Sequence, residues 1–383
     1  MKSTQNKSED NHRGRSGIQP DNNPRRLRRV LAMRFSALGD VAMTVPVLYS
    51  ACACYPDVHF TFVTRKSMTS IFINPPSNLT VKGIDLEHGY KGVGGLWHLF
   101  RELRAEVGFD GFIDLHDVLR TKIFSLYCRM YGIPVSTINK GRRGKRALTR
   151  RHNKVLLPLQ SSRARYRQVL HRIGLPVESR FDGLYGENGK GNPADFSAIT
   201  TPKLHGEKFV GIAPFAKHAG KIYPPALMLQ VLQDIVEVPG VRIFLFGGGG
   251  DESDLLDMWA GKFDNVTSLA GKRYGFAAEL ALVSHLDVMV SMDSANMHLA
   301  SLVRTPVVSI WGATHPYCGF NGWRQREEDT VQLPMTCRPC SVFGNKPCFR
   351  GDYHCLRGIS PNAVIRRVKK YIAPDEVADN VKS

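Results

Sequence analysis

The fold is decided by residues 29–54, RVLAMRFSALGDVAMTVPVLYSACAC. The apolar run at 29–35 has the length of a buried strand, whereas the longer apolar run at 41–54 is typical of a helix. Between them, residues 36–40 contain a glycine that permits a tight turn. A strand, a turn and a helix in this order predict the first βα unit of a parallel sheet.

The same alternation continues through the first half of the chain. Apolar runs of strand length recur, and helical patterns separate them. Repeated βα units predict a parallel sheet that is covered by helices on both faces. Further strands are predicted at 59–64, 79–84, 111–115 and 135–138, and helices at 96–107 and 118–131.

The pattern breaks at about 175–205, where Pro, Gly, Asn and Ser accumulate, and then restarts. A chain of 383 residues also favours two domains, because single cores stop growing near about 250–300 residues. We therefore predict an α/β protein of two Rossmann-like doubly wound domains, at 28–190 and 205–358. In the second domain, strands are predicted at 209–213, 241–246, 266–269, 288–292 and 306–310, and helices at 225–236, 252–260, 276–285 and 295–303.

The two ends of the chain differ from this pattern. Residues 1–27 are polar and basic, and we interpret them as a disordered arm rather than a signal peptide or an anchor. Residues 359–383 are predicted to hold a C-terminal helix at 361–372, which suits either domain, and a tail. Because no run approaches the roughly 18 apolar residues of a membrane span, we expect a cytoplasmic protein.

The charge balance restricts the kind of partner. The chain contains 52 Lys and Arg residues and 34 Asp and Glu residues, which gives a formal net charge of +18. Such a charge attracts polyanions such as nucleic acid, anionic lipid or a phosphorylated sugar. A hydrophobic content of 43% is typical of a soluble globular protein. The chain lacks a recognisable nucleic-acid reader motif, and aromatic residues are not interleaved with its basic runs, so we expect no nucleic-acid partner.

The loops that follow strands hold the candidate catalytic residues, because ligands of doubly wound sheets bind beyond the carboxyl ends of the strands. Asp40 follows the first strand, where a carboxylate can act as a general base; the alternative is an aspartate that only complements a helix dipole. Lys221 follows the first strand of the second domain, where its charge would neutralise a diphosphate. Lys217 is its rival in the same loop, and a solvated lysine is the alternative for both.

The glycine run at 247–250 is a candidate for nucleotide binding. Glycines let the backbone approach a ligand closely, and Asp251 or Glu252 can then accept hydrogen bonds from ribose hydroxyls. The run has neither the spacing of a dinucleotide fingerprint nor a phosphate-loop lysine, so a flexible turn is the alternative.

The segment DSANMH at 293–298 is the most specific candidate. Asp293 or Ser294 can cap the helix that follows, and the amides at the start of that helix can bind a diphosphate. His298 lies one turn further, within reach of the same phosphates. The alternative is a capped helix with a packed histidine.

Four of the eight cysteines cluster near the C-terminus, as Cys337-x2-Cys340-x7-Cys348-x6-Cys355. Four thiols with one Cys-x-x-Cys pair suit a tetrahedral structural zinc ion. The spacings of seven and six are not those of a standard zinc finger, so free or disulfide-linked thiols stay open as alternatives.

Taken together, these loops resemble glycosyltransferase family 9, the ADP-heptose:lipopolysaccharide heptosyltransferases. The resemblance covers about residues 28–325, and it depends on the order and spacing of the whole set. The matching features are Ser36-x-Leu-Gly-Asp40, the lysine loop that ends at Lys221-x-x-Pro224, the glycine turn before Glu252, Asp293-Ser-Ala-x-x-His298 and Pro306-Val-Val-Ser-Ile-Trp-Gly312.

The resemblance implies a GT-B fold, two domains that face each other across a cleft, with the acceptor in the first and the nucleotide sugar in the second. It implies an inverting, metal-independent transfer of heptose from ADP-heptose to the lipopolysaccharide inner core, on Kdo-lipid A or a heptosyl acceptor. Asp40 and Lys221 are the catalytic residues that it implies. The implied donor-binding residues are Lys217, Gly248, Glu252, Tyr274, Phe276, Asp293, Ser294, Ala295 and His298.

Basic residues of the first domain fit a phosphorylated, lipid-linked sugar acceptor. Arg120 and Lys122 follow the fourth strand, and Arg142 and Arg143 lie in a basic stretch at 140–146. We expect these four residues to bind the acceptor, with a solvated loop as an equal alternative. Such an acceptor further implies peripheral contact with the cytoplasmic face of the inner membrane.

The chain departs from the simplest family members in its basic arm, its four cysteines and the sequence Phe215-Ala-Lys217-His218, which replaces a threonine-type phosphate loop. The last difference leaves the donor open. A GT-B glycosyltransferase that uses another nucleotide sugar in cell-envelope glycan synthesis is therefore the alternative function. A non-enzymatic polyanion or nucleic-acid binder is the third hypothesis.

Overall fold

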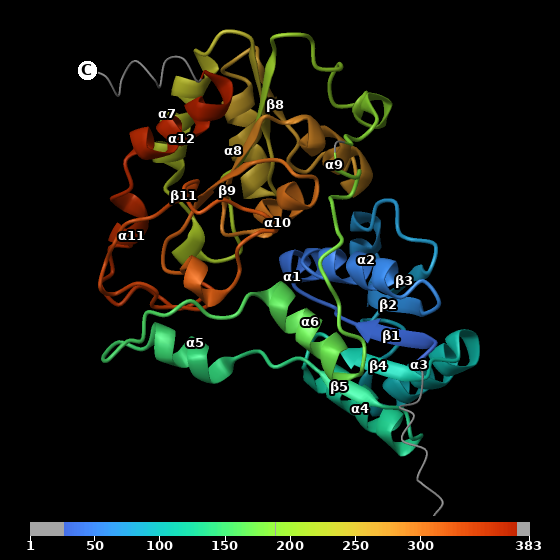
Figure 1. Ribbon diagram of the computed structural model, residues 1–383. Coiled ribbons are helices and arrows are strands. Elements are labelled where there is room, and N and C mark those ends of the chain that lie inside the picture. The colour runs from blue at the N-terminus through green and yellow to red at the C-terminus, as the bar shows by residue number, and fades with distance from the viewer. Residues whose placement is uncertain (1–26, 188, 374–383) are drawn as a thin grey trace, which may run out of the picture.

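Two parallel sheets form the centres of two α/β halves in the computed structural model, which describes residues 27–187 and 189–373 (Figure 1). The first sheet has the strand order β3-β2-β1-β4-β5, and the second has the order β11-β10-β9-β6-β7-β8. Neighbouring strands pair in parallel throughout both sheets. The strands are β1 Arg29–Met33, β2 His59–Arg65, β3 Leu79–Ile84, β4 Gly111–Asp114 and β5 Val135–Thr137, then β6 Lys208–Ala213, β7 Val241–Leu245, β8 Val266–Ser268, β9 Val288–Met292, β10 Val307–Ile310 and β11 Thr330–Val331.

Helices cover both faces of each sheet (Figure 1). In the first half they are α1 Leu38–Ala42, α2 Val45–Cys54, α3 Gly92–Val107, α4 Leu119–Met130, α5 Arg142–Thr149 and α6 Ser162–Arg172. In the second half they are α7 Pro225–Val236, α8 Asp251–Ala260, α9 Phe276–His285, α10 Ala295–Leu302, α11 His354–Arg357 and α12 Pro361–Ile372. Short 3₁₀ helices are η1 Lys66–Ile71, η2 Pro193–Phe196, η3 Ala219–Lys221 and η4 Pro316–Cys318.

Strand β1 shows why the first sheet is buried on both faces. Val30 and Ala32 point to one hydrophobic cluster, whereas Leu31 and Met33 point to another on the opposite face. All four side chains are at most 1% exposed. A continuous apolar run is what a parallel strand between two helical layers requires.

One hydrophobic cluster continues from the first half into the second. It joins Val30 and Ala32 of β1 to Phe209 of β6 and Leu280 of α9. The other face of the second sheet packs on α7, α8 and α12, so the C-terminal helix belongs to the second half. Because the halves share apolar packing, the loops between them are held in place from both sides.

The strand order of each sheet reverses beside its first strand. Strand β1 lies between β2 and β4, and β6 lies between β9 and β7. Such switch points open a crevice at the carboxyl ends of the strands, which is where ligands bind in doubly wound sheets. The loops after β1, β4, β6 and β9 therefore occupy the positions from which a site can be built.

The predicted strands are all present, and their ends differ from the predicted ones by at most two residues. The helix predicted at 41–54 is instead two helices, α1 and α2, with a turn at 43–44. Pro46 accounts for the new start, because proline has no backbone N–H and suits the first turn of a helix. Apart from Leu27, the arm predicted at 1–27 lies outside the described residues, as does the tail after 373.

Candidate active site

A cavity of about 510 Å³ lies between the two halves, where the loop after β1 meets the loops after β6, β7 and β9. Both predicted catalytic residues border this cavity, and so do all the predicted donor-binding residues except two. The lining residues are Ala37, Leu38, Gly39, Asp40, Phe215, Ala216, Lys217, His218, Lys221, Phe246, Gly247, Gly248, Glu252, Asp293, Ser294, Ala295, Asn296, His298, Phe320 and Phe343.

Asp40 is held by a buried arginine at the end of β1. Arg34 Nη2 lies 2.5 Å from Asp40 Oδ2, and Arg34 Nη1 donates a hydrogen bond of 2.5 Å to the carbonyl oxygen of Leu115. The hydroxyl of Tyr166 on α6 donates to the backbone oxygen of Asp40 at 3.2 Å. Two strands and a helix therefore fix the carboxylate, whose side chain keeps 29% of its exposure toward the cavity.

The electrostatic surroundings keep Asp40 ionised at neutral pH. Burial alone would raise the pKa of its carboxyl, but the charge of Arg34, the charge of His298 when protonated, the hydrogen bond of Arg34 and the charge of Lys145 together outweigh burial and lower it. Burial lowers the pKa of Lys145 on α5 to about 8, although the charge of Asp40 opposes that change. A carboxylate in this state can accept a proton.

A buried histidine after β4 supports the loop that carries Asp40. His116 Nδ1 accepts a hydrogen bond from the Phe35 amide at 3.3 Å, and its Nε2 lies 3.2 Å from the Ser36 hydroxyl. Burial lowers the pKa of His116 to about 3. The ring is therefore neutral, and it can accept from the Phe35 amide at any physiological pH.

On the opposite wall of the cavity, Lys221 and Asp293 form an ion pair. The Lys221 amine lies 2.8 Å from Asp293 Oδ2, and the Asp293 side chain is only 3% exposed. Gly344 packs on the aliphatic part of Lys221, where an added Cβ would lie 2.6 Å from Cγ. The amine is thus fixed at the cavity wall, next to the start of α10.

The start of α10 presents its backbone to the cavity. We expected Asp293 or Ser294 to cap this helix, but that prediction is wrong, because no side-chain cap is present. Asp293 pairs with Lys221 instead, and the Ser294 hydroxyl lies 3.3 Å from the Ser291 hydroxyl. Uncapped amides at a helix N-terminus are a binding site for anions. Ser294, Ala295 and Asn296 border the cavity at this point.

His298 joins the two halves. A Cβ added to Gly39 would lie 2.5 Å from His298 Cδ2, so the ring packs directly on the glycine of the Asp40 loop. Burial lowers the pKa of His298 to about 4. The imidazole is therefore neutral at physiological pH and would act on phosphates as a hydrogen-bond donor, not as a cation.

The glycine turn after β7 holds its own acidic residue in place. The Gly248 amide donates to Glu252 Oε2 at 2.8 Å, and an added Cβ at Gly248 would lie 3.1 Å from the same oxygen. Gly250 has a φ of +68°, which disfavours any residue with a side chain. Glu252 therefore borders the cavity with one oxygen already bonded to the turn.

Tyr274 and Phe276 are the predicted donor residues that do not border the cavity. Both are partly buried against the hydrophobic cluster that joins the halves. They follow β8, which is the outer strand of the second sheet, so they lie one strand further from the switch point than the glycine turn does. Both side chains keep part of their surface exposed, and contact of Tyr274 and Phe276 with the nucleotide stays a prediction.

Several cavity residues escaped the sequence analysis. Phe320 and Phe343 border the cavity from loops that follow β10 and β11, and the Lys145 amine lies 4.5 Å and 5.8 Å from the centres of their rings. Arg34, which does not line the cavity but holds Asp40, follows the last residue of β1 directly and lies within the apolar run predicted as a strand. The sequence does mark Arg34, because it is a single charged residue within an apolar run. A charged side chain is rarely buried without a partner, so this position indicated a buried ion pair.

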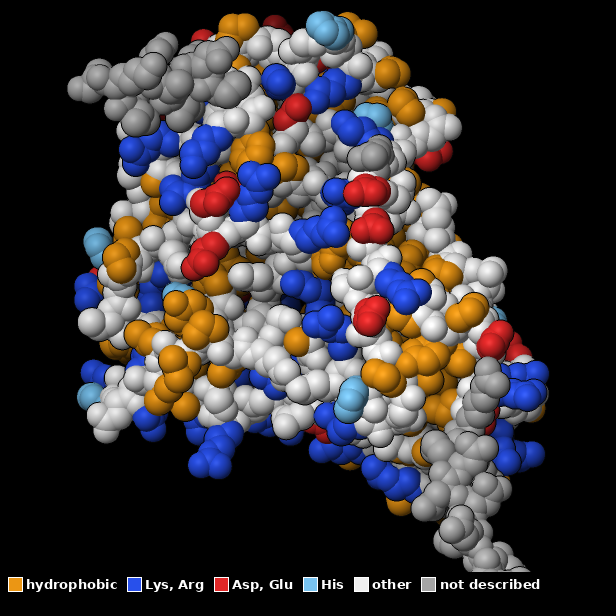
Figure 2. Space-filling model, viewed as in Figure 1, with side chains coloured by type: hydrophobic (Ala, Val, Ile, Leu, Met, Phe, Trp, Pro, Cys, Tyr) orange, Lys and Arg blue, Asp and Glu red, His pale blue; other side chains and the backbone are white. Residues whose placement is uncertain are grey.

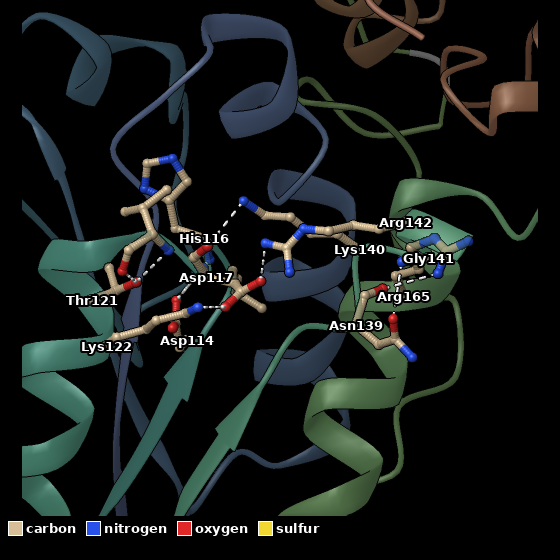
Figure 3. Close-up of polar contacts among 12 residues, drawn as sticks. Asp114, His116, Asp117, Thr121, Lys122, Asn139, Lys140, Gly141, Arg142 and Arg165 are labelled. Carbon is tan, nitrogen blue, oxygen red and sulfur yellow. Dashed lines mark hydrogen bonds and ion pairs between the residues drawn. The ribbon is translucent and has the colours of Figure 1, made fainter. Parts of the chain in front are cut away.

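Two of the four basic residues predicted to bind the acceptor, Lys122 and Arg142, lie around one carboxylate (Figure 3). Lys122 and Arg142 approach Asp117 from two sides, at 3.4 Å and 2.6 Å, and Lys140 donates to its backbone oxygen at 3.1 Å. Asp114 Oδ1 accepts from the amides of His116 and Asp117, both at 2.8 Å, and fixes this loop after β4.

Two of the predicted acceptor residues have exposed side chains that do not contact Asp117. Arg120 and Arg143 are exposed, whereas Lys122 and Arg142 share Asp117. The loop after β4 is next to the loop of Asp40, because β4 pairs with β1. Binding of an acceptor by these four residues stays a prediction that their position favours.

The four C-terminal cysteines border one small cavity beside Arg338. None of the eight cysteines, all within the described residues, forms a disulfide. As placed, no three side chains of His, Cys, Asp or Glu among the described residues stand close enough to hold one metal ion. Zinc at Cys337, Cys340, Cys348 and Cys355 therefore stays a prediction.

Comparison with known proteins agrees with this geometry. Residues 96–346 match the family model of glycosyltransferase family 9 (heptosyltransferase). Lipopolysaccharide heptosyltransferase 1 of Pseudomonas aeruginosa is 25% identical over 322 residues, which cover 82% of this chain and 86% of that protein. Lipopolysaccharide heptosyltransferase 3 of Escherichia coli is 26% identical over 312 residues, which cover 79% and 86%.

The fold also has a solved counterpart. The structure of E. coli heptosyltransferase WaaC with ADP-2-deoxy-2-fluoro heptose is similar with a TM-score of 0.60 and 17% identity, over 89% of this chain and 99% of that one. This likeness confirms the predicted GT-B fold of two Rossmann-like halves. Since the family model covers more than half of its residues, the chain belongs to glycosyltransferase family 9, the heptosyltransferases.

Proposed function

We propose that this enzyme transfers heptose from ADP-heptose to a hydroxyl of the lipopolysaccharide inner core, with inversion at the anomeric carbon. One observation carries the proposal: Asp40 from the first half borders the same cavity as Lys221 and the start of α10 from the second. A proton acceptor and a phosphate site are thereby brought to one place. Family membership favours this enzyme over the non-enzymatic polyanion binder.

The donor is assigned to the wall formed by the second half. Its diphosphate would lie at the uncapped amides of α10 and beside the Lys221 amine, because both carry positive charge into the cavity. Its ribose would lie at the glycine turn, where Glu252 can accept hydrogen bonds. Lys217 is exposed and stands at the rim, a second cation for the same diphosphate.

Transfer then follows from the placement of these groups. The acceptor hydroxyl attacks the anomeric carbon from the face opposite the diphosphate, and its proton passes to Asp40. The bond from the anomeric carbon to the phosphate oxygen breaks, and its electron pair leaves with ADP. General-base catalysis contributes about 10²–10⁴-fold, and fixed positive groups such as Lys221 stabilise the charge that grows on ADP.

We propose that transfer requires no metal ion. Lys221 and the amides at the start of α10 already supply positive charge where ADP departs. A chelator in the assay should therefore leave the initial rate unchanged. A rate that falls with chelator and returns with Mg²⁺ would contradict this proposal.

We also propose that the four C-terminal thiols hold a structural zinc ion. Their Cys-x-x-Cys pair and the cavity that they share support this. Elemental analysis of the purified protein should find about one zinc per chain, and Cys337→Ser together with Cys348→Ser should remove it. Purified wild-type protein without zinc would contradict the proposal.

The acceptor is assigned to the first half and to a membrane. The exposed Arg120 and Arg143 and the group around Asp117 offer a basic surface to phosphates and Kdo carboxylates. Such an acceptor is lipid-linked, so we place the enzyme at the cytoplasmic face of the inner membrane. Among the described residues, no helix has the length and apolarity to cross a bilayer.

A donor panel tests the function. The enzyme is incubated with Kdo-lipid A or its heptosylated form and with ADP-heptose, ADP-glucose, UDP-glucose or UDP-N-acetylglucosamine, and products are identified by mass spectrometry. We expect transfer from ADP-heptose and none from the UDP-sugars. Faster transfer from a UDP-sugar would favour the alternative, a GT-B enzyme with another donor.

A further inference from the structure

The excess positive charge of the chain comes from one segment. Residues 118–177 contain fifteen Lys and Arg and no Asp or Glu, whereas the rest of the chain holds 37 Lys and Arg against 34 Asp and Glu. Nearly the whole net charge of +18 thus lies in α4, α5, α6 and their connections. A field of this strength attracts a polyanionic surface.

Helix α5 and the residues that follow it, 142–158, form the most exposed part of this segment. Leu148 is its one buried residue, while Arg142, Arg143 and Arg146 are exposed, as are Arg150 and Arg151 just after it. The helix is held by Leu148, by Lys145 on the rings of Phe320 and Phe343 and by Arg142 on Asp117, while Arg143 and Arg146 extend into solvent. In Figure 1 it lies beside the segment that links β11 to α11 in the second half.

An apolar run follows these arginines and is also exposed. Val155, Leu156 and Leu157 have exposed fractions of 41%, 50% and 64%. The run is not a loose end, because the Lys154 amine donates to the backbone oxygens of Cys337 at 2.7 Å and Pro339 at 2.9 Å. Three consecutive exposed aliphatic residues in a held segment indicate a contact surface.

The surface continues onto the second half. The Arg151 guanidinium lies 5.0 Å from the centre of the Phe349 ring, and Phe349 is 51% exposed. Figure 2 shows hydrophobic side chains gathered over the segment between β11 and α11, with Lys and Arg side chains along α5 beside them. We call Arg150, Arg151, Leu156, Leu157 and Phe349 the basic–apolar surface.

We propose that the basic–apolar surface docks on a bilayer that contains anionic lipid. Its arginines would contact lipid phosphates, while its leucines and phenylalanine would enter the boundary between headgroups and acyl chains. A soluble glycan would match the arginines but leave the aliphatic residues in water, so the combination favours a membrane. The inference rests on the proposed function, because that function requires a lipid-linked acceptor.

The position of this surface suits the reaction. Lys145 belongs to α5, and its amine contacts the rings of Phe320 and Phe343, which border the cavity. The docked face and the cavity are therefore connected through one helix. A sugar that projects from the bilayer beside α5 would meet the loops of Asp117 and Asp40.

Vesicle flotation tests the docking without donor or acceptor. The full chain is mixed with vesicles of phosphatidylcholine alone or of phosphatidylcholine with phosphatidylglycerol. We expect binding to the anionic vesicles only, and release at high salt. Equal binding to both kinds of vesicle, or to neither, would overturn the proposal.

Two double variants locate the surface, and each has a matched control. Leu156→Asn with Leu157→Asn, and Arg150→Gln with Arg151→Gln, should each lower partition to anionic vesicles by at least about tenfold. The controls are Leu204→Asn with Met258→Asn and Lys91→Gln with Lys262→Gln, which change exposed residues elsewhere and should bind as the wild type does. Test variants that bind like their controls would place the contact on another surface and refute ours.

A second readout separates this inference from the function. The leucine double variant should keep wild-type transfer to a deacylated, soluble acceptor but lose transfer to the acceptor in vesicles. Equal loss on both acceptors, or on neither, would refute the docking role. If the wild type bound anionic vesicles yet transferred heptose to neither acceptor, the proposed function would fail while docking stood.

Discussion

Arg34→Gln is predicted to change the pH dependence of transfer, because Arg34 controls the state of Asp40. Arg34 Nη2 lies 2.5 Å from Asp40 Oδ2, and the Asp40 side chain is 29% exposed. Burial raises the pKa of this carboxyl, and Arg34 is the strongest group opposing that effect. An opposite charge at such a distance lowers a carboxyl pKa by about 1–3 units, so its removal should move the acid limb of kcat/KM up by about 1–3 pH units.

The sign of the stability effect follows from the same pair. The folded-state pKa of Asp40 is lowered, so the pair stabilises the fold above the unfolded pKa of about 3.9, and this stability is lost as pH falls through the folded value. At neutral pH, Arg34→Gln should therefore lower the free energy of unfolding. Breaking a buried pair costs about 3–5 kcal/mol, and the partial exposure of Asp40 favours the lower end.

The assay is kcat/KM for heptose transfer as a function of pH, with thermal unfolding measured on the same samples. Arg34→Lys is the matched control, because it retains the charge and should keep the acid limb within about one pH unit of the wild type. The reasoning would be refuted by a folded Arg34→Gln enzyme whose acid limb coincides with that of the wild type.

Two further predictions concern the contacts across the cavity. Gly39→Ala would place a Cβ 2.5 Å from His298 Cδ2, and the resulting shift of the Asp40 loop should lower kcat/KM by about 10²-fold. The control is Gly94→Ala, whose added Cβ meets nothing within 4 Å and should leave kcat/KM unchanged. Equal rates for the two variants would contradict this prediction. Lys221→Gln should lower kcat by about 10²–10³-fold and weaken ADP binding in calorimetry. Because Lys221→Gln leaves Asp293 buried without its cation, this variant should also lower the melting temperature. Lys217 is exposed, so Lys217→Gln should lower kcat less than Lys221→Gln does. A larger loss in Lys217→Gln would assign the stabilisation of the diphosphate to Lys217 instead.

The course of the strands could be predicted because their residues carry the signal themselves. A parallel strand such as β9 is buried on both faces, so an unbroken apolar run predicts it, and here the predicted ends 288 and 292 are also the observed ones. The loops after β1, β6 and β9 could be placed at a common cleft because topology alone brings them there.

Helices without an apolar stripe escaped prediction. The sequence of α5, RRGKRALT, buries only Leu148, so hydrophobic periodicity cannot reveal it. Its position depends instead on contacts that are distant in sequence, such as Lys145 with Phe320 and Phe343. The aromatic rings of the cavity were missed for the same reason.

Side-chain partners in the site were also beyond the sequence. A cap by Asp293 or Ser294 was the local expectation, but the tertiary fold brings Lys221 to the Asp293 carboxylate, and no side chain caps the helix amides. Tyr274 and Phe276 were placed by resemblance at the nucleotide, and their partial packing against the shared hydrophobic cluster is a contact that the sequence did not indicate. Local pattern predicts which loops meet, whereas packing decides which atoms pair.

The central claim is that Asp40 is the base for a donor held by the other half. Asp40→Asn keeps the size of the side chain but removes its ability to accept the proton. We predict that kcat for transfer from ADP-heptose falls by about 10²–10⁴-fold while the Kd of ADP, measured by calorimetry, stays within about twofold. A variant that binds ADP normally and turns over at the wild-type rate would contradict the account.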